Sequence, residues 1–339
     1  MNVGFIFKHR INSVMPFRVC NSVLNNTSLV HLSDNNHSTT VTIIPELAML
    51  HEFIILADGR PFNIIENYSL DRPPREQVTH YFRSAKLSPW VCRLANGRYK
   101  FNGNVYQVER MYNDGTALHG LLFDQPFTVS RQFAGNDGAY VILRHDYTGY
   151  DSGFPYTYQC EVTYTLKRDG ELMIQTVVTN TGAGSFPLAD GWHPYFQLGG
   201  KADDWELYFN ASAMVEFDER LIPTGRLLPY RRFNPAEPIG NTKMDNCFAL
   251  DKEGPENGGP QFACTVKNPA NGVSVSFLPS RSYPYLQIFI PDHRESIAIE
   301  NISSAPDSFN NNMGLRVLGP GQTASFEVSV KAGVELPDL

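Results

Sequence analysis

CEVTYTLKRDGELMIQTVVTNTG, residues 160–182, decides the fold class of this chain. Residues 161–166 and 171–178 each alternate apolar and polar side chains, which is the period of a β-strand with one buried face. Between them, residues 167–170 (KRDG) have the composition of a tight turn. The stretch therefore predicts an antiparallel β-hairpin.

Similar alternating segments continue along the chain from Thr39 to the C-terminus. They include TVTIIP, EFIILADGRPFNII, AYVILRHDYTG, VSVSFLP, YLQIFIP and ASFEVSVKAG. The 26 Gly, 23 Pro and 12% aromatic residues suit many short strands joined by tight turns. Only two short segments, 46–53 (ELAMLHEF) and 74–85 (PREQVTHYFRSA), are candidates for helices. We therefore predict an all-β fold built from packed antiparallel sheets.

No linker, low-complexity tract or repeat interrupts residues 39–339, which we expect to form a single domain. Residues 1–38 are polar, rich in Asn and end in SDNNHS, and we expect them to be a loosely ordered leader. Met15 is a candidate for the true start of the protein. The first twenty residues contain no apolar stretch long enough for the core of a secretion signal.

Composition narrows the class of partner. The net charge of −7 includes no basic block, so we expect no nucleic acid to bind. No window approaches the roughly 18 uninterrupted apolar residues of a membrane span. The five cysteines are odd in number, far apart and without a CxxC pair, so their spacing predicts neither a disulfide framework nor a zinc site. We expect a cytoplasmic monomer or homodimer.

Seven segments carry a family resemblance in their order along the chain. They are SPWVCRLANGRYKFNG (88–103), ALHGLLFDQPF (117–127), DGWHPYFQL (190–198), MDNCFAL (244–250), YLQIFIP (285–291), SIAIENISSAPDSFNN (296–311) and LRVLGPGQTASFEVSV (315–330). Together they resemble the aldose 1-epimerase, or galactose mutarotase, family. The resemblance implies a large antiparallel β-sandwich of the galactose mutarotase type and cofactor-free interconversion of the α and β anomers of a free hexose such as glucose or galactose.

The same resemblance assigns roles to six residues, and it requires no metal. It implies that His193 is the catalytic acid and Glu300 the catalytic base, and that four further side chains bind the sugar: Arg93, His119, Asp245 and Gln287. Three residues beside these positions depart from the family pattern. Cys92 and Trp192 stand where the family has Asn, and Asn301 stands where it has Pro.

The reaction explains why these residue types are needed. Mutarotation opens a hemiacetal to an aldehyde and recloses it on the other face, so one proton leaves the anomeric hydroxyl while another reaches the ring oxygen. A carboxylate can take the first proton, and an imidazolium with a pKa near 6.5 can supply the second. Glu300 and His193 fit these two roles. Trp192 and Tyr195 are candidates for stacking on an apolar face of the sugar.

Each assignment has a plainer structural alternative. Most histidines are surface or satisfied core residues, Arg93 can close a surface salt bridge, and Asp245 can cap a turn. Gln287 can be an ordinary outward residue of an alternating strand. Glu300, by contrast, lies within the apolar run Ile297–Ile302, where a charge is costly unless it points outward or has a function.

Three other functions remain open from the sequence. A mutarotase of a hexose 6-phosphate would need further cations near the site, for which Arg83, Lys86 and Arg281 are candidates. A non-catalytic carbohydrate-binding protein could use the same sandwich, although an acid and a base would then be retained without a role. A glycan lyase or hydrolase is the third, and a hydrolase would usually show two carboxylates flanking a cleft.

Overall fold

The hairpin predicted over residues 160–182 is present in the computed structural model, which describes residues 16–35, 39–251 and 262–334. Strand β13 (Tyr158–Lys167) pairs antiparallel with β14 (Leu172–Asn180), and every second residue of both strands is buried. The turn between them contains the 3₁₀ segment η2 (Arg168–Gly170). Asp169 and Gly170 have φ values of 62° and 69°, the left-handed conformation that tight hairpin turns require.

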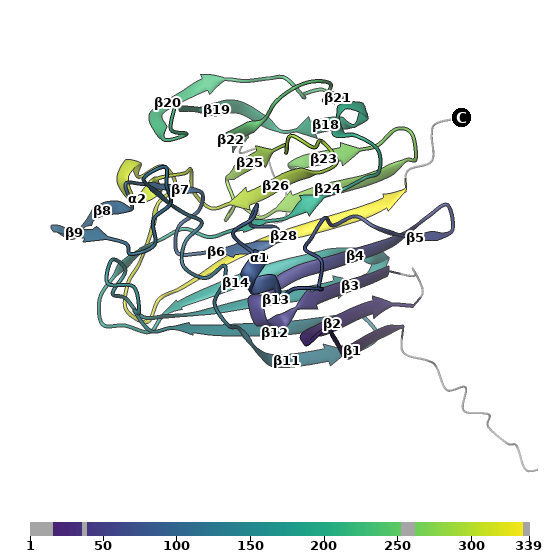
Figure 1. The fold of residues 1–339 in the computed structure, drawn as a ribbon, viewed down its shortest axis with the longest axis horizontal. Coiled ribbons are helices and arrows are strands. Elements are labelled where there is room, and N and C mark those ends of the chain that lie inside the picture. Colours follow the sequence, from purple (N-terminus) through teal and green to yellow (C-terminus); the bar gives the residue numbers. More distant parts are fainter. Residues whose placement is uncertain (1–15, 36–38, 252–261, 335–339) are drawn as a thin grey trace, which may run out of the picture.

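These two strands belong to a nine-stranded sheet that runs through the molecule (Figure 1). Its order is β11 (Thr128–Ala134), β12 (Gly138–Tyr147), β13, β14, β28 (Thr323–Val334), β24 (Val273–Pro279), β23 (Cys264–Lys267), β18 (Glu206–Phe209) and β21 (Glu237–Pro238). Strand β28 pairs with β14 on one side and with β24 on the other. It therefore joins β11–β14, which come earlier in the sequence, to β18, β21, β23 and β24, which come later.

A five-stranded sheet packs against the nine-stranded sheet, with contacts from β2 to β12 and from β4 to β28. Its order is β1 (Phe17–Leu24), β2 (Thr27–Asp34), β3 (Thr39–Ile44), β4 (Met49–Ala57) and β5 (Arg60–Asn63). The 3₁₀ segment η1 (Pro45–Leu47) connects β3 to β4.

The expectation of a loose leader over residues 1–38 is wrong for residues 17–34, which form β1 and β2. The two strands pair along their whole length, and Asn25 and Asn26 make the turn with φ values of 47° and 65°. Asn tolerates that conformation well, so the Asn-rich composition marks a hairpin turn here. Residues 1–15 and 36–38 lie outside the described residues.

The third large sheet has eight strands and carries the candidate site. Its order is β20 (Pro223–Pro229), β19 (Ala211–Phe217), β22 (Asp245–Leu250), β25 (Tyr285–Phe289), β26 (Ile297–Ile302), β16 (Gly191–His193) and β6 (Ala85–Leu87), with β17 (Tyr195–Phe196) also paired to β26. All six residues of β26 are buried. Its near-continuous apolar sequence is the pattern of a strand covered on both faces.

The remaining elements are short. Three two-stranded sheets pair β7 (Arg93–Ala95) with β10 (Thr116–Leu118), β8 (Arg98–Phe101) with β9 (Asn104–Gln107), and β15 (Phe186–Leu188) with β27 (Arg316–Leu318). The helical elements are α1 (Pro74–Gln77), α2 (Ser308–Asn311) and the 3₁₀ segment η3 (Ala202–Asp204). Of the two helix candidates, residues 74–85 therefore contain a single turn of helix. Residues 49–53 are instead part of strand β4, because Met49, Leu50 and Phe53 are buried between the sheets.

The prediction of an all-β antiparallel sandwich is confirmed. One hydrophobic cluster extends from Phe17 in β1 to Val330 in β28 and fills the space between the sheets. All five cysteines are free thiols. No helix within the described ranges has the length and hydropathy that a membrane span needs.

Candidate active site

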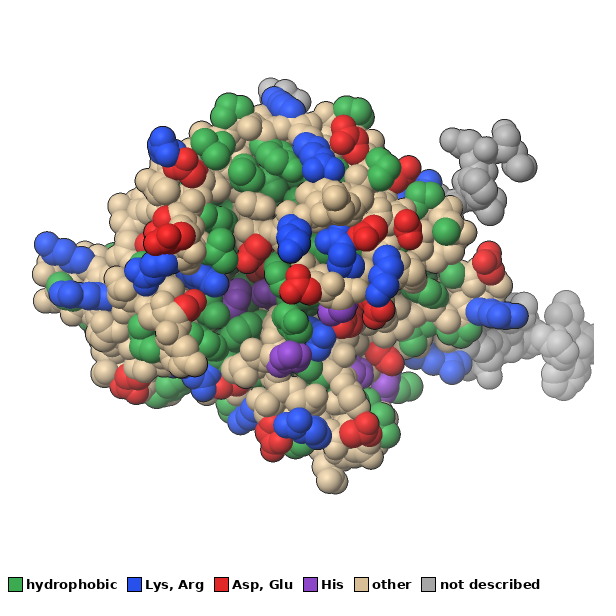
Figure 2. All heavy atoms as spheres, turned by 45° about the horizontal axis from the view of Figure 1, so that its top comes forward, with side chains coloured by type: hydrophobic (Ala, Val, Ile, Leu, Met, Phe, Trp, Pro, Cys, Tyr) green, Lys and Arg blue, Asp and Glu red, His purple; other side chains and the backbone are tan. Residues whose placement is uncertain are grey.

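A cavity of about 260 Å³ contains all six side chains that the sequence nominated. It is slightly smaller than the roughly 300–1,000 Å³ of pockets for drug-sized ligands, which suits a ligand of monosaccharide size. Figure 2 shows a face of the molecule on which histidine side chains lie recessed among hydrophobic ones. The cavity is lined by Tyr81, Phe82, Cys92, Arg93, Leu118, His119, His193, Tyr195, Phe217, Leu221, Asp245, Gln287, Phe289, Glu300 and Pro306.

Strand register brings three of these polar side chains to one face of the eight-stranded sheet. Gln287 in β25 lies directly opposite Glu300 in β26 and directly opposite Cys247 in β22. Directly opposed residues point to the same face, and so do residues two apart on one strand. Asp245, two residues before Cys247, therefore joins them, and Gln287 Nε2 donates a 2.8 Å hydrogen bond to Asp245 Oδ1.

His193 and Glu300 lie in direct contact in the cavity. Nε2 of His193 is 3.3 Å from Oε1 of Glu300, and the two side chains are only 7% and 2% exposed. His193 ends β16, which lies between β6 and β26 in the sheet. The ring of Tyr195 stacks on the imidazole, with ring centroids 5.2 Å apart and ring planes inclined by 12°. This separation lies within the roughly 4.5–7 Å that is typical of aromatic pairs.

Arg93 and His119 come from outside the eight-stranded sheet: Arg93 begins β7, and His119 follows β10, the strand that pairs with β7. Arg93 is directly opposite Leu118, and the backbone N–H of His119 donates a 2.9 Å hydrogen bond to the carbonyl of Cys92. His119 and Cys92 have φ values of 60° and 49°, a conformation that non-glycine residues seldom adopt outside constrained sites. These backbone conformations turn both side chains into the cavity.

Gly120 explains how the His119 turn packs so closely. Its φ of 79° is left-handed, and a Cβ placed on it would lie 2.1 Å from the carbonyl oxygen of Ser88. Only glycine fits that approach. The Leu-His-Gly segment thus supplies the site residue His119, and its glycine allows the close approach of the backbone to Ser88.

Burial sets the protonation of the acid–base pair. Desolvation lowers the pKa of His193 from 6.5 to about 3. Desolvation, followed by the charge of Asp245, raises the pKa of Glu300 well above its usual value. Desolvation therefore favours a neutral imidazole and a protonated carboxyl in the free pair over the imidazolium and carboxylate expected from ordinary pKa values. Both arrangements contain one proton.

The other cavity groups respond to burial in the same way. Desolvation, followed by the charges of His193 and Arg93, lowers the pKa of His119 well below 6.5. Desolvation raises the pKa of Asp245, while Arg93 and the hydrogen bond from Gln287 oppose that rise. Arg93 itself donates from Nε to the carbonyl of Arg220 at 3.2 Å and lies 3.8 Å from Asp114. The lining thus places these buried polar groups around the one Lys or Arg side chain that the described cavity residues include, Arg93.

The three departures from the family pattern lie in different places. Cys92 lines the cavity. Trp192 precedes His193 on β16, and Asn301 follows Glu300 on β26. Adjacent residues of a strand point to opposite faces. Trp192 belongs to the main hydrophobic core and does not line the cavity, so the suggestion that it stacks on the sugar is wrong. Tyr195, the other stacking candidate, does line it.

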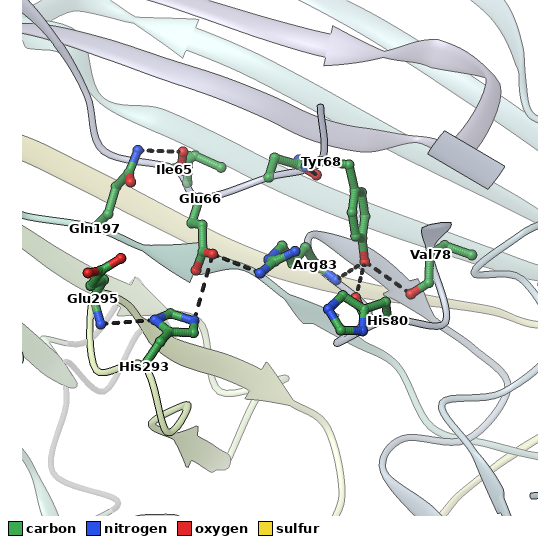
Figure 3. A network of polar contacts seen from close by, with 10 residues as sticks. Ile65, Glu66, Tyr68, Val78, His80, Arg83, Gln197, His293 and Glu295 are labelled. Carbon is green, nitrogen blue, oxygen red and sulfur yellow. Dashed lines mark hydrogen bonds and ion pairs between the residues drawn. The ribbon is translucent and has the colours of Figure 1, made fainter. Parts of the chain in front are cut away.

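A polar network supports the segment that carries Tyr81 and Phe82 (Figure 3). Arg83 donates to Glu66 at 2.7 Å, and its backbone N–H donates to the hydroxyl of Tyr68 at 2.7 Å. The Tyr68 hydroxyl in turn donates toward the carbonyls of Val78 and His80. The Arg83 guanidinium also lies over the rings of Tyr81 and Tyr195. This network fixes one rim of the cavity.

The three cations proposed for a phosphate group do not line the cavity. Arg83 pairs with Glu66. Lys86 is buried in a contact with Asp190, whose other carboxylate oxygen accepts a 2.6 Å hydrogen bond from the hydroxyl of Tyr283. Arg281 lines a different cavity, beside Tyr283 and Pro284.

Several cavity residues have no signal in the sequence. Tyr81, Phe82, Phe217, Leu221 and Phe289 form an apolar surround for the polar groups. They come from separate loops and strand ends, and aromatic and aliphatic residues are common throughout the chain. Only their placement in the cavity lining distinguishes them from core residues.

One group of cavity residues has the composition of a metal site. Cys92, His119 and Glu300 are all buried, and one ligand atom from each lies within 4.8 Å of the others. Thiolate, imidazole and carboxylate together suit a transition metal or zinc. Because these three residues are far apart in the chain, no motif spacing in the sequence indicates the group.

The antiparallel sandwich matches the fold of solved galactose mutarotase-like proteins. A solved galactose mutarotase-like protein from Clostridium acetobutylicum superposes with a TM-score of 0.83 at 17% identity, covering 94% of this chain and 99% of that chain. The chain belongs to the aldose 1-epimerase family, whose family model matches residues 65–331. Members of this family are isomerases.

Two relatives are similar in sequence. The uncharacterized protein YihR of Escherichia coli (strain K12) is 26% identical over 245 residues, covering 70% of this chain and 74% of the relative. The galactose mutarotase of Homo sapiens is 30% identical over 183 residues, which is 52% of this chain and 51% of the human protein. The match to the human enzyme thus spans about half of each chain.

Proposed function

We propose that the chain interconverts the α and β anomers of a free hexose of the glucose or galactose type. The observation that carries the proposal is the buried 3.3 Å contact between His193 Nε2 and Glu300 Oε1 within a cavity of about 260 Å³. An acid–base pair must lie within hydrogen-bond reach of the reacting oxygens, and such contacts tighten when a substrate binds. Both groups face the same small cavity, as the reaction requires.

The proton steps follow from the single proton that the pair holds. Transfer of that proton from Glu300 to His193 gives a carboxylate and an imidazolium without exchange with water. Glu300 then accepts the proton of the anomeric hydroxyl while His193 donates to the ring oxygen, so the C1–O5 bond breaks and an aldehyde forms. Rotation about C1–C2 and reversal of both transfers yield the other anomer and restore the pair.

The remaining polar groups suit a neutral sugar. Arg93 and His119 can donate hydrogen bonds to sugar oxygens and to the charge that develops on O1 or O5. Asp245 and Gln287 can bind adjacent hydroxyl groups. Arg93 is the one Lys or Arg side chain among the described residues that line the cavity, and it already lies near Asp114. This favours a free aldose over a hexose 6-phosphate.

Polarimetry of freshly dissolved sugars tests the proposal. Wild type should speed the change in optical rotation of α-D-glucose or α-D-galactose above the buffer rate. His193→Asn and Glu300→Gln should each lower kcat by about 10²–10⁴-fold, the usual contribution of a general acid or base. His51→Asn, a half-buried histidine of β4 outside the cavity, is the matched control and should keep its rate.

The outcomes separate the alternatives. A wild type no faster than buffer on several aldoses and their 6-phosphates would refute an enzymatic function and favour a carbohydrate-binding protein. Activity confined to the 6-phosphates would refute the free-hexose assignment. Full activity in both site variants would show that the pair is not the acid and base.

A further inference from the structure

We propose that Cys92, His119 and Glu300 bind one thiophilic divalent cation of the Zn²⁺ type, and that this cation competes with the sugar for the cavity. Metal binding goes beyond the proposed function, whereas the competition rests on it. The site lies within the cavity already described but uses Cys92, to which the proposed reaction gives no role.

The first argument is geometric. One ligand atom from each of the three residues lies within 4.8 Å of the others. Ligand atoms around a tetrahedral zinc, with bonds of about 2.0–2.3 Å, are roughly 3.3–3.8 Å apart. A shift of about 1 Å by the side chains therefore closes the site, and the backbone hydrogen bond from His119 to Cys92 already holds two of the ligands together.

The second argument concerns donors that lack partners. Nδ1 of His119 and Oε2 of Glu300 are buried and have no hydrogen-bond partner within the described part of the chain. The two residues are 92% and 98% buried, given exposures of 8% and 2%. Buried polar atoms are normally paired, so unpaired ones beside a cavity indicate a ligand.

The third argument is the chemistry of the ligand set. Sulfur and imidazole nitrogen favour zinc and cobalt, whereas magnesium and calcium take oxygen ligands. His193 Nε2, 3.3 Å from Glu300 Oε1, is placed to be a fourth ligand or to face a metal-bound water. A cation held by Glu300 would occupy the carboxylate that the sugar reaction needs. Zinc should therefore inhibit.

The test uses Co²⁺ as a spectroscopic probe on the full, chelator-treated chain. Titration of wild type should give a sulfur-to-cobalt charge-transfer band in the near ultraviolet that saturates at one equivalent, and Zn²⁺ should displace the cobalt. Cys92→Ser should abolish the band and weaken binding by at least about 100-fold, because even outer-shell changes cost about 10–100-fold. Cys20→Ser, which removes an exposed thiol, should leave the titration unchanged.

Circular dichroism and thermal unfolding establish that each variant is folded, so a lost band reports the site. A wild type without the band, or a band that persists in folded Cys92→Ser, would overturn the metal site. Added D-galactose should weaken Co²⁺ binding, and Zn²⁺ should raise the apparent KM for the sugar. Metal binding that sugar leaves unchanged would overturn the competition. Because the cobalt titration needs no turnover, a chain without mutarotase activity would refute the proposed function and leave the metal site testable.

Discussion

The kcat/KM of metal-free wild type for a free hexose should change by less than about twofold between pH 5 and 7.5. Burial places the pKa of His193 at about 3. At pH 5, about one chain in a hundred therefore carries a second proton on the His193–Glu300 pair. Burial also raises the pKa of Glu300 well above its usual value, which favours retention of the pair's one proton as the pH rises. We therefore expect the singly protonated pair to dominate across the range.

A site with ordinary pKa values would behave differently. If His193 titrated near 6.5, its protonated fraction, and with it kcat/KM, would rise about tenfold as the pH falls from 7.5 to 5.5. The assay is the initial rate of change in optical rotation at low sugar concentration, in chelating buffer, with the spontaneous rate at each pH subtracted. Since kcat/KM reports the free enzyme, a limb with an apparent pKa near 6.5 would refute the buried-pair reasoning. Circular dichroism at each pH serves as the control for folding.

Three further predictions concern stability. The raised pKa of Glu300 means that the folded chain holds this proton at pH values where the unfolded chain has lost it, so wild-type stability falls as the pH rises above about 4.5. Between pH 6.5 and 8.5, the Tm of Glu300→Gln should therefore fall less than the Tm of wild type. Equal falls in Tm for the two proteins would contradict the burial argument. Lys86→Met leaves the buried carboxylate of Asp190 without its cation and should cost about 3–5 kcal/mol in urea unfolding, whereas a loss below about 1 kcal/mol would show that the pair contributes little. Gly120→Ala should lower Tm and raise KM, because its Cβ meets the carbonyl of Ser88; an unchanged Tm would show that this backbone approach relaxes freely.

Local sequence patterns determined the strands. The alternation in residues 160–182 identified β13, the turn and β14. Side chains two residues apart lie on the same face of a strand, so a strand with one buried face shows an alternation that a short stretch of sequence contains. The same reasoning missed β1 and β2. Strand β1 lies at the sheet edge and is largely exposed, so it buries too little apolar surface to show a clear alternation. Strand β2 lies between β1 and β3 and is largely buried, but the polar, Asn-rich composition around it led us to expect a leader.

Resemblance in segment order nominated the six site residues, and the tertiary structure brings all six to one cavity. Their proximity depends on cross-strand register, which sets Gln287 opposite Glu300 and Arg93 opposite Leu118. Register is a relation between segments far apart in the chain, so no single motif contains it. The sequence could name the residues, but their contacts depended on the pairing of the sheets.

The protonation of His193 and Glu300 and the position of Cys92 were decided by the fold alone. Residue type suggested an imidazolium and a carboxylate, but desolvation by surrounding side chains favours the neutral forms of both groups. Cys92, Trp192 and Asn301 were equivalent departures in the sequence, yet only Cys92 reaches the cavity. The sequence by itself determined the fold class and the acid and base to consider. The burial of His193 and Glu300 and the strand face on which each lies depend on residues distant in the chain. These two features of the tertiary structure decided the charge of the pair and the side chains around it.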